Sequence, residues 1–103
     1  MNDDVIVTIF RSRLRPDADG YGEEAARMEE QARAMPGFLE MKGYTAEDGE
    51  RVTIVAFDSM AAHEAWRDHA DHRDAQRRGR SEFYAWYRLQ VCRQLRERTF
   101  IAP

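Results

Sequence analysis

Residues 66–87 read WRDHADHRDAQRRGRSEFYAWY. This stretch holds both tryptophans, two of the three histidines and two of the four tyrosines, together with five arginines and four acidic residues. A short helix is predicted over residues 71–78, with Asp71 as its N-cap and Gly79 at its end. Aromatic surface, imidazole and positive charge interleaved in this way are typical of a pocket for a planar, partly anionic organic molecule. We therefore expect a functional site in this stretch.

The stretch leads into a strand over residues 81–95, because two sets of side chains alternate along it. One face of this strand would consist of Phe83, Ala85, Tyr87, Leu89 and Val91. The other face would consist of Tyr84, Trp86, Arg88, Gln90 and Cys92. We predict that the first face packs against helices, and that the second lines a cavity or meets another subunit. On this alternation Tyr84 lines the cavity, Tyr87 lies in the core, and Cys92 is a small buried residue.

The chain begins with a predicted strand and helix. Residues 5–14 are rich in β-branched and aromatic side chains, which favour a strand. Apolar side chains then recur at helical spacing from Tyr21 to Met35, which predicts a helix of about 14–18 residues. The glutamates near its start suit the positive end of the helix dipole.

Residues 38–45 and 51–58 predict a hairpin whose turn contains Gly49, and Ser59 is a suitable N-cap for a further short helix. The order β-α-β-β-α-(α)-β is that of the ferredoxin-like, or split β-α-β, fold. The predicted fold class is therefore α+β, with an antiparallel sheet that helices cover on one face.

The other face of this sheet would be open. Phe10, Tyr84 and Trp86 are expected there, where together they make an apolar patch too large to remain in water. We therefore expect two copies to pair through their open faces as a homodimer.

The composition predicts one domain over residues 1–103, with a core of about residues 5–95 and a C-terminal tail over 96–103. Of the 103 residues, 43% are apolar and 34% are charged, which is typical of a globular chain. No apolar run approaches the ~20 residues of a membrane span, and the N-terminus does not resemble a signal peptide. A single cysteine provides no disulfide framework. The expected location is the cytoplasm, without membrane binding.

Charge is distributed unevenly along the chain. Residues 1–65 carry seven basic and 14 acidic side chains, whereas residues 66–103 carry nine basic and five acidic ones. A basic third can indicate a nucleic-acid partner. However, the net charge of the whole chain is −3, and no nucleic-acid-binding motif is present, so no nucleic-acid partner is expected.

Several short motifs together resemble the antibiotic biosynthesis monooxygenase family. They are MPGF at residues 35–38, AW at 65–66, and the pattern H-x-x-H-R-x-A-Q-x-x-G-R-x-x-(F/W)-Y-x-x-Y over 69–87. The resemblance extends over about residues 5–95 and agrees with the predicted order of elements. It implies a dimeric α+β barrel in which two ferredoxin-like units pair their sheets. Members resemble cofactor-free monooxygenases of polyphenols and quinols, haem-degrading enzymes, or proteins without a known substrate.

Trp66, His69 and His72 are the candidate catalytic residues. Trp66 lies on the apolar side of its predicted helix, where it would pack in the core, line a cavity, or do both. The resemblance implies that a tryptophan at this position contacts bound aromatic substrate. The two histidines could cap loop backbone between two short helices or handle a proton near neutral pH. A metal site would require a third placed ligand, so no metal is expected.

Five further residues are candidates for substrate binding: Phe10, Arg73, Tyr84, Trp86 and Arg88. An arginine in the cavity could hold a phenolate or carboxylate through its guanidinium group, although ion pairing at the surface is the alternative for Arg73. The expected ligand is a small aromatic molecule, and no cofactor is expected.

The resemblance implies oxygen insertion into a phenol or hydroquinone, and the alternative is a dimeric binding protein without catalysis. Haem degradation is disfavoured at two positions. The haem-degrading branch places its iron-ligating histidine where this chain has Gln76, and it uses an asparagine on the first strand, whereas the only asparagine here is Asn2.

Overall fold

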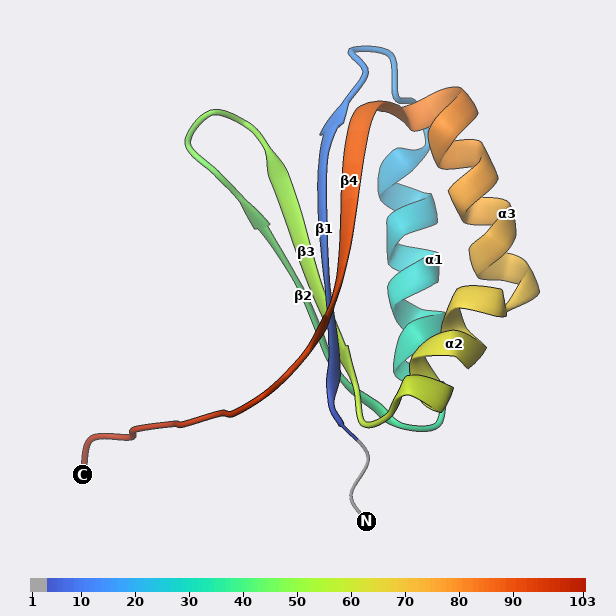
Figure 1. The fold of residues 1–103 in the computed structure, drawn as a ribbon. Coiled ribbons are helices and arrows are strands. Elements are labelled where there is room, and N and C mark those ends of the chain that lie inside the picture. The colour runs from blue at the N-terminus through green and yellow to red at the C-terminus, as the bar shows by residue number, and fades with distance from the viewer. Residues whose placement is uncertain (1–3) are drawn as a thin grey trace.

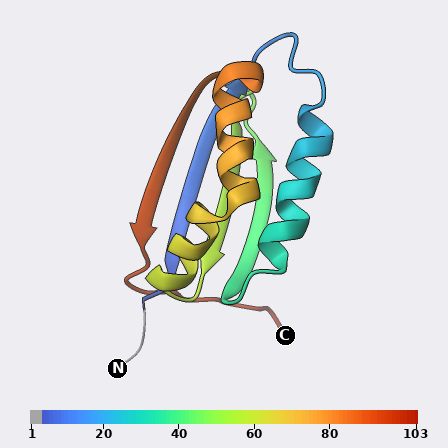
Figure 2. The same cartoon turned by 90° about the vertical axis from the view of Figure 1, so that its right-hand side faces the viewer.

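A computed structural model describes residues 4–103, so Asn2 lies outside the described residues. The elements follow in the order β1 (Ile6–Leu14), α1 (Tyr21–Arg33), β2 (Phe38–Thr45), β3 (Arg51–Phe57), α2 (Met60–Asp68), α3 (Ala70–Arg78), a π-helical turn (Gly79–Phe83) and β4 (Tyr84–Arg93). The strands form one antiparallel sheet in the order β2-β3-β1-β4. All three helices cover the same face of this sheet (Figures 1 and 2). The predicted ferredoxin-like α+β fold is therefore confirmed.

The turn between β2 and β3 contains the glycine that the sequence suggested. Gly49 has a φ of +91°, a conformation that L side chains rarely adopt. Arg13 of β1 donates a hydrogen bond to the backbone oxygen of Asp48 in this turn at 3.0 Å. The hairpin is thus tied to the neighbouring strand.

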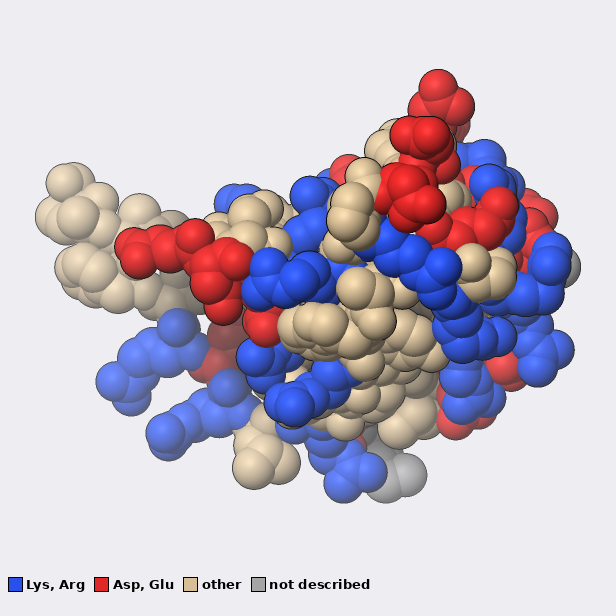
Figure 3. Space-filling model, turned by 90° about the horizontal axis from the view of Figure 1, so that it is seen from above, with Lys and Arg blue, Asp and Glu red and all other residues tan. Residues whose placement is uncertain are grey.

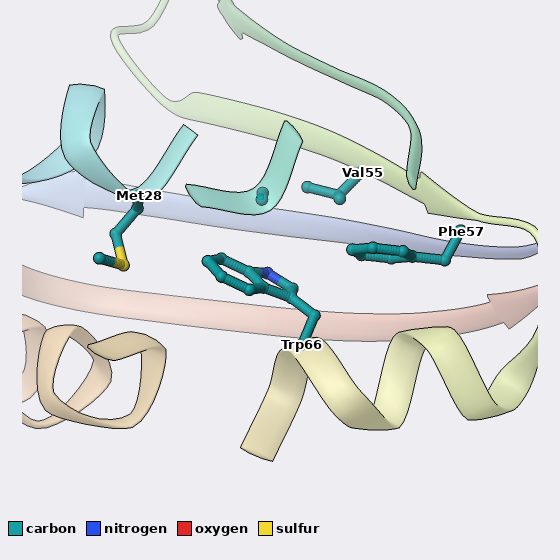
Figure 4. Packing of buried hydrophobic residues seen from close by; sticks show 5 residues of the cluster. Met28, Val55, Phe57 and Trp66 are labelled. Carbon is teal, nitrogen blue, oxygen red and sulfur yellow. The ribbon is translucent and has the colours of Figure 1, made fainter. Parts of the chain in front are cut away.

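The core lies between the helices and the sheet. Met28 and Ala32 come from α1, Val55 and Phe57 from β3, and Trp66 from α2, and each is at most 7% exposed. Figure 4 shows the Trp66 side chain pointing from α2 toward the sheet, between Met28 and Phe57. The predicted apolar stripe of the first helix therefore faces the sheet, although α1 itself ends at Arg33.

The fourth strand departs from the predicted alternation. Arg13 pairs with Trp86 but Leu14 pairs with Tyr84, so Ala85 is an extra residue on β4 and forms a bulge. Tyr84 consequently lies on the same side of the sheet as Tyr87, and their ring centroids are 5.9 Å apart. The prediction that these two tyrosines point to opposite faces is wrong, because the alternation of side chains restarts at the bulge.

Three other predictions, for Phe10, Tyr87 and Cys92, are also wrong. Phe10 lies on the helix-covered face, since it is opposite Leu89 and contacts the Tyr84 ring, with 5.3 Å between centroids. Tyr87 faces the helices but is 42% exposed rather than buried in the core, because β4 is an edge strand that the helices leave partly uncovered (Figure 2). Cys92 is exposed.

Residues 94–103 follow β4 without forming a helix or strand. Figure 1 shows this segment extending away from the sheet and helices. Its large apolar side chains are almost fully exposed, at 91% for Leu95, 84% for Phe100 and 83% for Ile101. Within the described part of the chain, no helix has the length and apolar character needed to span a membrane.

Charges of both signs are spread over the molecule. Seen from above, basic and acidic side chains both occur at this end (Figure 3). Several arginines of the basic C-terminal third are paired with acidic residues, as Arg67 is with Asp68 and Arg93 is with Asp4. The basic third of the sequence is thus partly neutralised in the fold.

Candidate functional site

A cavity of about 190 Å³ lies between the helices and the sheet. Its wall includes side chains from all three helices, all four strands and the π-helical turn. An engineered cavity of roughly 150 Å³ is sufficient to hold benzene, so this one has room for a ligand of one ring or of two compact rings. The cavity is on the helix-covered face, whereas the sequence placed it on the open face.

Aromatic side chains form one wall of the cavity. Phe10 meets Tyr84 edge-on, and its centroid is 5.4 Å from that of Tyr87. Tyr21 of α1 contacts both Phe83 and Tyr84, at 5.7 Å and 5.8 Å between centroids. Edge-to-face packing of this kind gives a well-ordered, largely apolar wall that also carries tyrosine hydroxyl groups.

Glycine at position 79 makes room for this wall. A Cβ added to Gly79 would lie 2.6 Å from Cε2 of Tyr84. The residue has a φ of −56°, an ordinary helical value. The prediction of a helix-ending glycine is therefore incomplete, because the helix continues as the π-helical turn and the glycine is needed for close packing of the Tyr84 ring.

Trp66 and His72 form another part of the wall. Their rings are stacked, with centroids 4.2 Å apart and an interplanar angle of 10°. The helical path is broken between the two residues at His69, whose ψ is 134°, so that α3 starts in a new direction at the end of α2. Trp66 is 6% exposed and lines the cavity, and it is therefore both a core residue and a wall residue.

The hydrogen bonding of His72 fixes its tautomer. Nδ1 lies 3.0 Å from the backbone oxygen of Trp66. A carbonyl oxygen only accepts, so Nδ1 carries the proton and Nε2 retains its lone pair. Burial lowers the pKa of His72, although the bond to the Trp66 carbonyl opposes this shift. The imidazole is consequently neutral near neutral pH and can accept a proton.

His69 has a different role. Its Nδ1 accepts a hydrogen bond from the backbone N–H of Asp71 at 3.2 Å, so its ring caps α3. His69 does not belong to the cavity wall. The sequence left two roles open for the histidines, capping of loop backbone and handling of a proton. In the structure His69 caps the backbone, whereas His72 lines the cavity.

Three of the predicted binding residues lie elsewhere. Arg73 is exposed and is not part of the cavity wall. Trp86 and Arg88 pair with Arg13 and Arg11 and share the open face of the sheet with them. Neither Arg73 nor Arg88 thus lines this cavity, whereas Phe10 and Tyr84 do.

The sequence did not indicate two polar wall residues, Glu24 and Gln76. Glu24 is 9% exposed, and its carboxylate binds Arg27 at 2.7 Å and Arg78 at 3.2 Å. A signal for it was available, because Glu24 is three residues after Tyr21 on the edge of the apolar stripe of α1. Gln76 is one helical turn after His72, on the same side of α3.

The Tyr84 hydroxyl on the wall is held in its protonated form. Burial raises the pKa of Tyr84 far above the ordinary value for tyrosine, and the neighbouring Tyr21 hydroxyl raises it further. The Tyr84 phenol therefore stays protonated and can donate a hydrogen bond. Among the described residues, no group of three or more His, Cys, Asp or Glu side chains has an arrangement suited to a metal ion.

The sequence matches the model of a family described as antibiotic biosynthesis monooxygenase over residues 5–78. A Bacillus subtilis (strain 168) protein, uncharacterized protein YqjZ, is 39% identical over 92 residues, which are 89% of this chain and 81% of that protein. The family match ends before the π-helical turn and β4, so Tyr84 lies outside the matched residues.

Solved structures share the fold. Rv0793 from Mycobacterium tuberculosis has a TM-score of 0.81 at 22% identity, covering 92% of this chain and 99% of that chain. A mutant form of SnoaB, a cofactor-independent oxygenase from Streptomyces nogalater, has a TM-score of 0.78 at 12% identity, covering 91% of this chain and 96% of that chain. At these identities the similarity shows a common fold.

Proposed function

Because the chain belongs to the antibiotic biosynthesis monooxygenase family, we propose that it inserts oxygen from O₂ into a small, electron-rich phenol or hydroquinone. The observation that carries this proposal is the stacked pair of Trp66 and His72 on the wall of an aromatic cavity. The printed description of SnoaB as a cofactor-independent oxygenase supports the same class of reaction.

His72 would act as the general base. Its tautomer leaves Nε2 free to accept a proton, and its burial keeps the imidazole neutral. Removal of a proton from the substrate gives a resonance-stabilised carbanion or phenolate. Tyr84 would donate a hydrogen bond to the phenolate oxygen, since its own proton is retained.

The substrate can supply all the electrons for this reaction. The carbanion passes one electron to O₂, and the resulting radical pair combines into a peroxide on a carbon that still bears one hydrogen. Loss of water from this peroxide leaves a carbonyl group. The substrate carbon is oxidised by four electrons, one oxygen atom enters the product and the other leaves as water. The protein contributes a base, a hydrogen-bond donor and a cavity sheltered from water.

The test is O₂ consumption measured with an electrode on menadiol- and anthrone-type substrates. His72→Phe keeps an aromatic ring against Trp66 but removes the base, so it should lower turnover by about 10²–10⁴-fold. The matched control is His69→Asn, which removes an imidazole but keeps a side chain that caps α3. It should retain turnover within about twofold, since it does not touch the cavity.

Three results would contradict the proposal. Equal turnover in wild type and His72→Phe would exclude His72 as the base. Binding of the aromatics without O₂ consumption above the autoxidation blank would instead indicate a binding protein. A Soret band on addition of hemin, lost with reductant, would indicate haem degradation, although Gln76 stands where that reading requires a histidine.

The homodimer also belongs to this proposal. On the open face Trp86 is 40% exposed and Tyr44 is 49% exposed, and a second copy would cover them. Trp86→Asp should therefore shift the mass measured by light scattering toward that of one chain. The control Met60→Asp changes a similarly exposed residue at the start of α2, on the helix side, and should leave the mass unchanged.

A further inference from the structure

The charge of the cavity wall is unusual for a site expected to bind an anion. Glu24 is the one acidic residue on the wall among the described residues, and neither arginine nor lysine contributes to it. His72 is neutral near neutral pH because burial lowers its pKa. The one charged side chain that a ligand meets on this described wall is therefore a carboxylate, which accepts hydrogen bonds but cannot donate them.

The carboxylate of Glu24 has accepting capacity left over. Oε1 accepts from Arg27 at 2.7 Å, and Oε2 accepts from Arg78 at 3.2 Å and from Arg27 at 3.4 Å. A carboxylate offers about four lone-pair directions, of which these bonds use three. The two arginines compensate the buried charge without themselves lining the cavity.

Glu24 and His72 come from different helices. Arg78, which binds Glu24, follows His72 by six residues along α3. A helical rise of 1.5 Å per residue places the backbones of His72 and Arg78 roughly 9 Å apart along α3. Two hydrogen-bond acceptors, Glu24 on α1 and Nε2 of His72 on α3, thus both belong to the wall of a cavity of about 190 Å³.

We propose that Glu24 determines substrate specificity by accepting a hydrogen bond from a second hydroxyl group of the substrate. The preferred ligand is a compact, neutral aromatic diol whose hydroxyls lie at opposite ends, one toward His72 and one toward Glu24. This inference rests on the proposed function for the role of His72. Ligands with a carboxylate at the second position are rejected, because an ionised carboxylate has no proton to donate to Glu24.

The expected discrimination follows from two general effects. A hydrogen bond to a charged acceptor contributes about 1.5–3 kcal/mol, so replacing the second hydroxyl by a methoxy group should weaken binding by about 10–100-fold. A carboxylate in its place also lacks a proton to donate and loses its own hydration, so it should weaken binding at least as much. Glu24→Gln removes the charge but keeps the shape of the side chain. It should therefore reduce the ratio of the affinity for the diol to the affinity for the carboxylate by at least about tenfold.

The test is isothermal titration calorimetry under nitrogen, where no turnover occurs. The probes are 2,6-dihydroxynaphthalene, its monomethyl ether and 6-hydroxy-2-naphthoate, titrated into wild type and Glu24→Gln. The matched control is Glu29→Gln, which makes the same change on the same helix at a side chain that is 47% exposed and outside the cavity. It should leave all three affinities unchanged.

Equal affinity of wild type for the three probes would overturn the inference, whether or not Glu24→Gln folds. A preference that persists unchanged in a folded Glu24→Gln variant would also overturn it. Failure of the proposed function has a different signature, because O₂ consumption would be absent while the preference for the diol, and its dependence on Glu24, were retained.

Discussion

Replacing Gly79 with alanine tests whether the backbone or a neighbouring ring requires this glycine. Its φ of −56° and ψ of −48° are right-handed helical values. The backbone alone would therefore favour alanine by about 0.4–1 kcal/mol, because alanine restricts the unfolded chain. The steric effect has the opposite sign, since the new Cβ would lie 2.6 Å from Cε2 and 2.9 Å from Cδ2 of Tyr84.

The Tyr84 ring is held in place by its neighbours. Phe10, Tyr21 and Tyr87 surround it with centroids 5.3 Å, 5.8 Å and 5.9 Å away. Overpacking costs about 1–3 kcal/mol, which outweighs the backbone gain. Gly79→Ala should therefore lower the free energy of unfolding by about 0.5–2 kcal/mol, and it should displace the ring from the cavity wall.

Urea unfolding followed by tryptophan fluorescence measures both effects in a double-mutant cycle. In a Tyr84→Ala background the clash is absent, so Gly79→Ala should raise the free energy of unfolding by about 0.4–1 kcal/mol. The same loss of stability in both backgrounds would refute the steric explanation. So would a Gly79→Ala single variant that is more stable than wild type.

Three further predictions concern stability. Burial lowers the pKa of His63 and His72 below the ordinary value of 6.5. As the pH falls below that value, the unfolded chain therefore binds protons that the folded chain does not. The free energy of unfolding should then fall by up to about 1.4 kcal/mol per pH unit for each histidine. Urea titrations at several pH values should show a shallower slope for His72→Gln. Trp66→Ala should cost about 3–5 kcal/mol in urea unfolding, and Trp66→Phe distinctly less. Gly37→Ala should lower the melting temperature, because φ is +84° and a Cβ would lie 2.5 Å from Oδ1 of Asp58.

Features that depend on local sequence were predictable. The stripe that begins at Tyr21 and the turn glycine Gly49 both depend on side chains close together in the chain, and both were confirmed. The position of Trp66 on the apolar side of its helix was confirmed for the same reason. Helical spacing also relates His72 to Gln76, although no local pattern favours this side of α3 over the side of Arg73.

Features that depend on pairing between distant segments were not predictable. The face of Tyr84 is set by the bulge opposite Arg13 and Leu14, about 70 residues earlier in the chain, and by the π-helical turn before it. From the sequence, the early glutamates of α1, Glu24 among them, were related only to the dipole of the helix. Its burial depends on Arg78, which comes from α3 and compensates its charge.

The bulge at Ala85 divides β4 into two parts, and the alternation of side chains between the two faces of the sheet does not continue from one part to the other. Removing Ala85 would restore strict alternation and leave the Tyr84 ring opposite Leu14 on the helix-covered face, while the pairing of residues 86–93 with β1 could remain as it is. Regular pairing with the chain length unchanged would instead place Ala85 opposite Leu14 and carry the Tyr84 ring to the open face. In a relative that lacks the bulge and aligns without a gap, the side chain at position 84 would therefore lie on the other face of the sheet, so identity at this position conveys little about a shared cavity unless the bulge is shared as well.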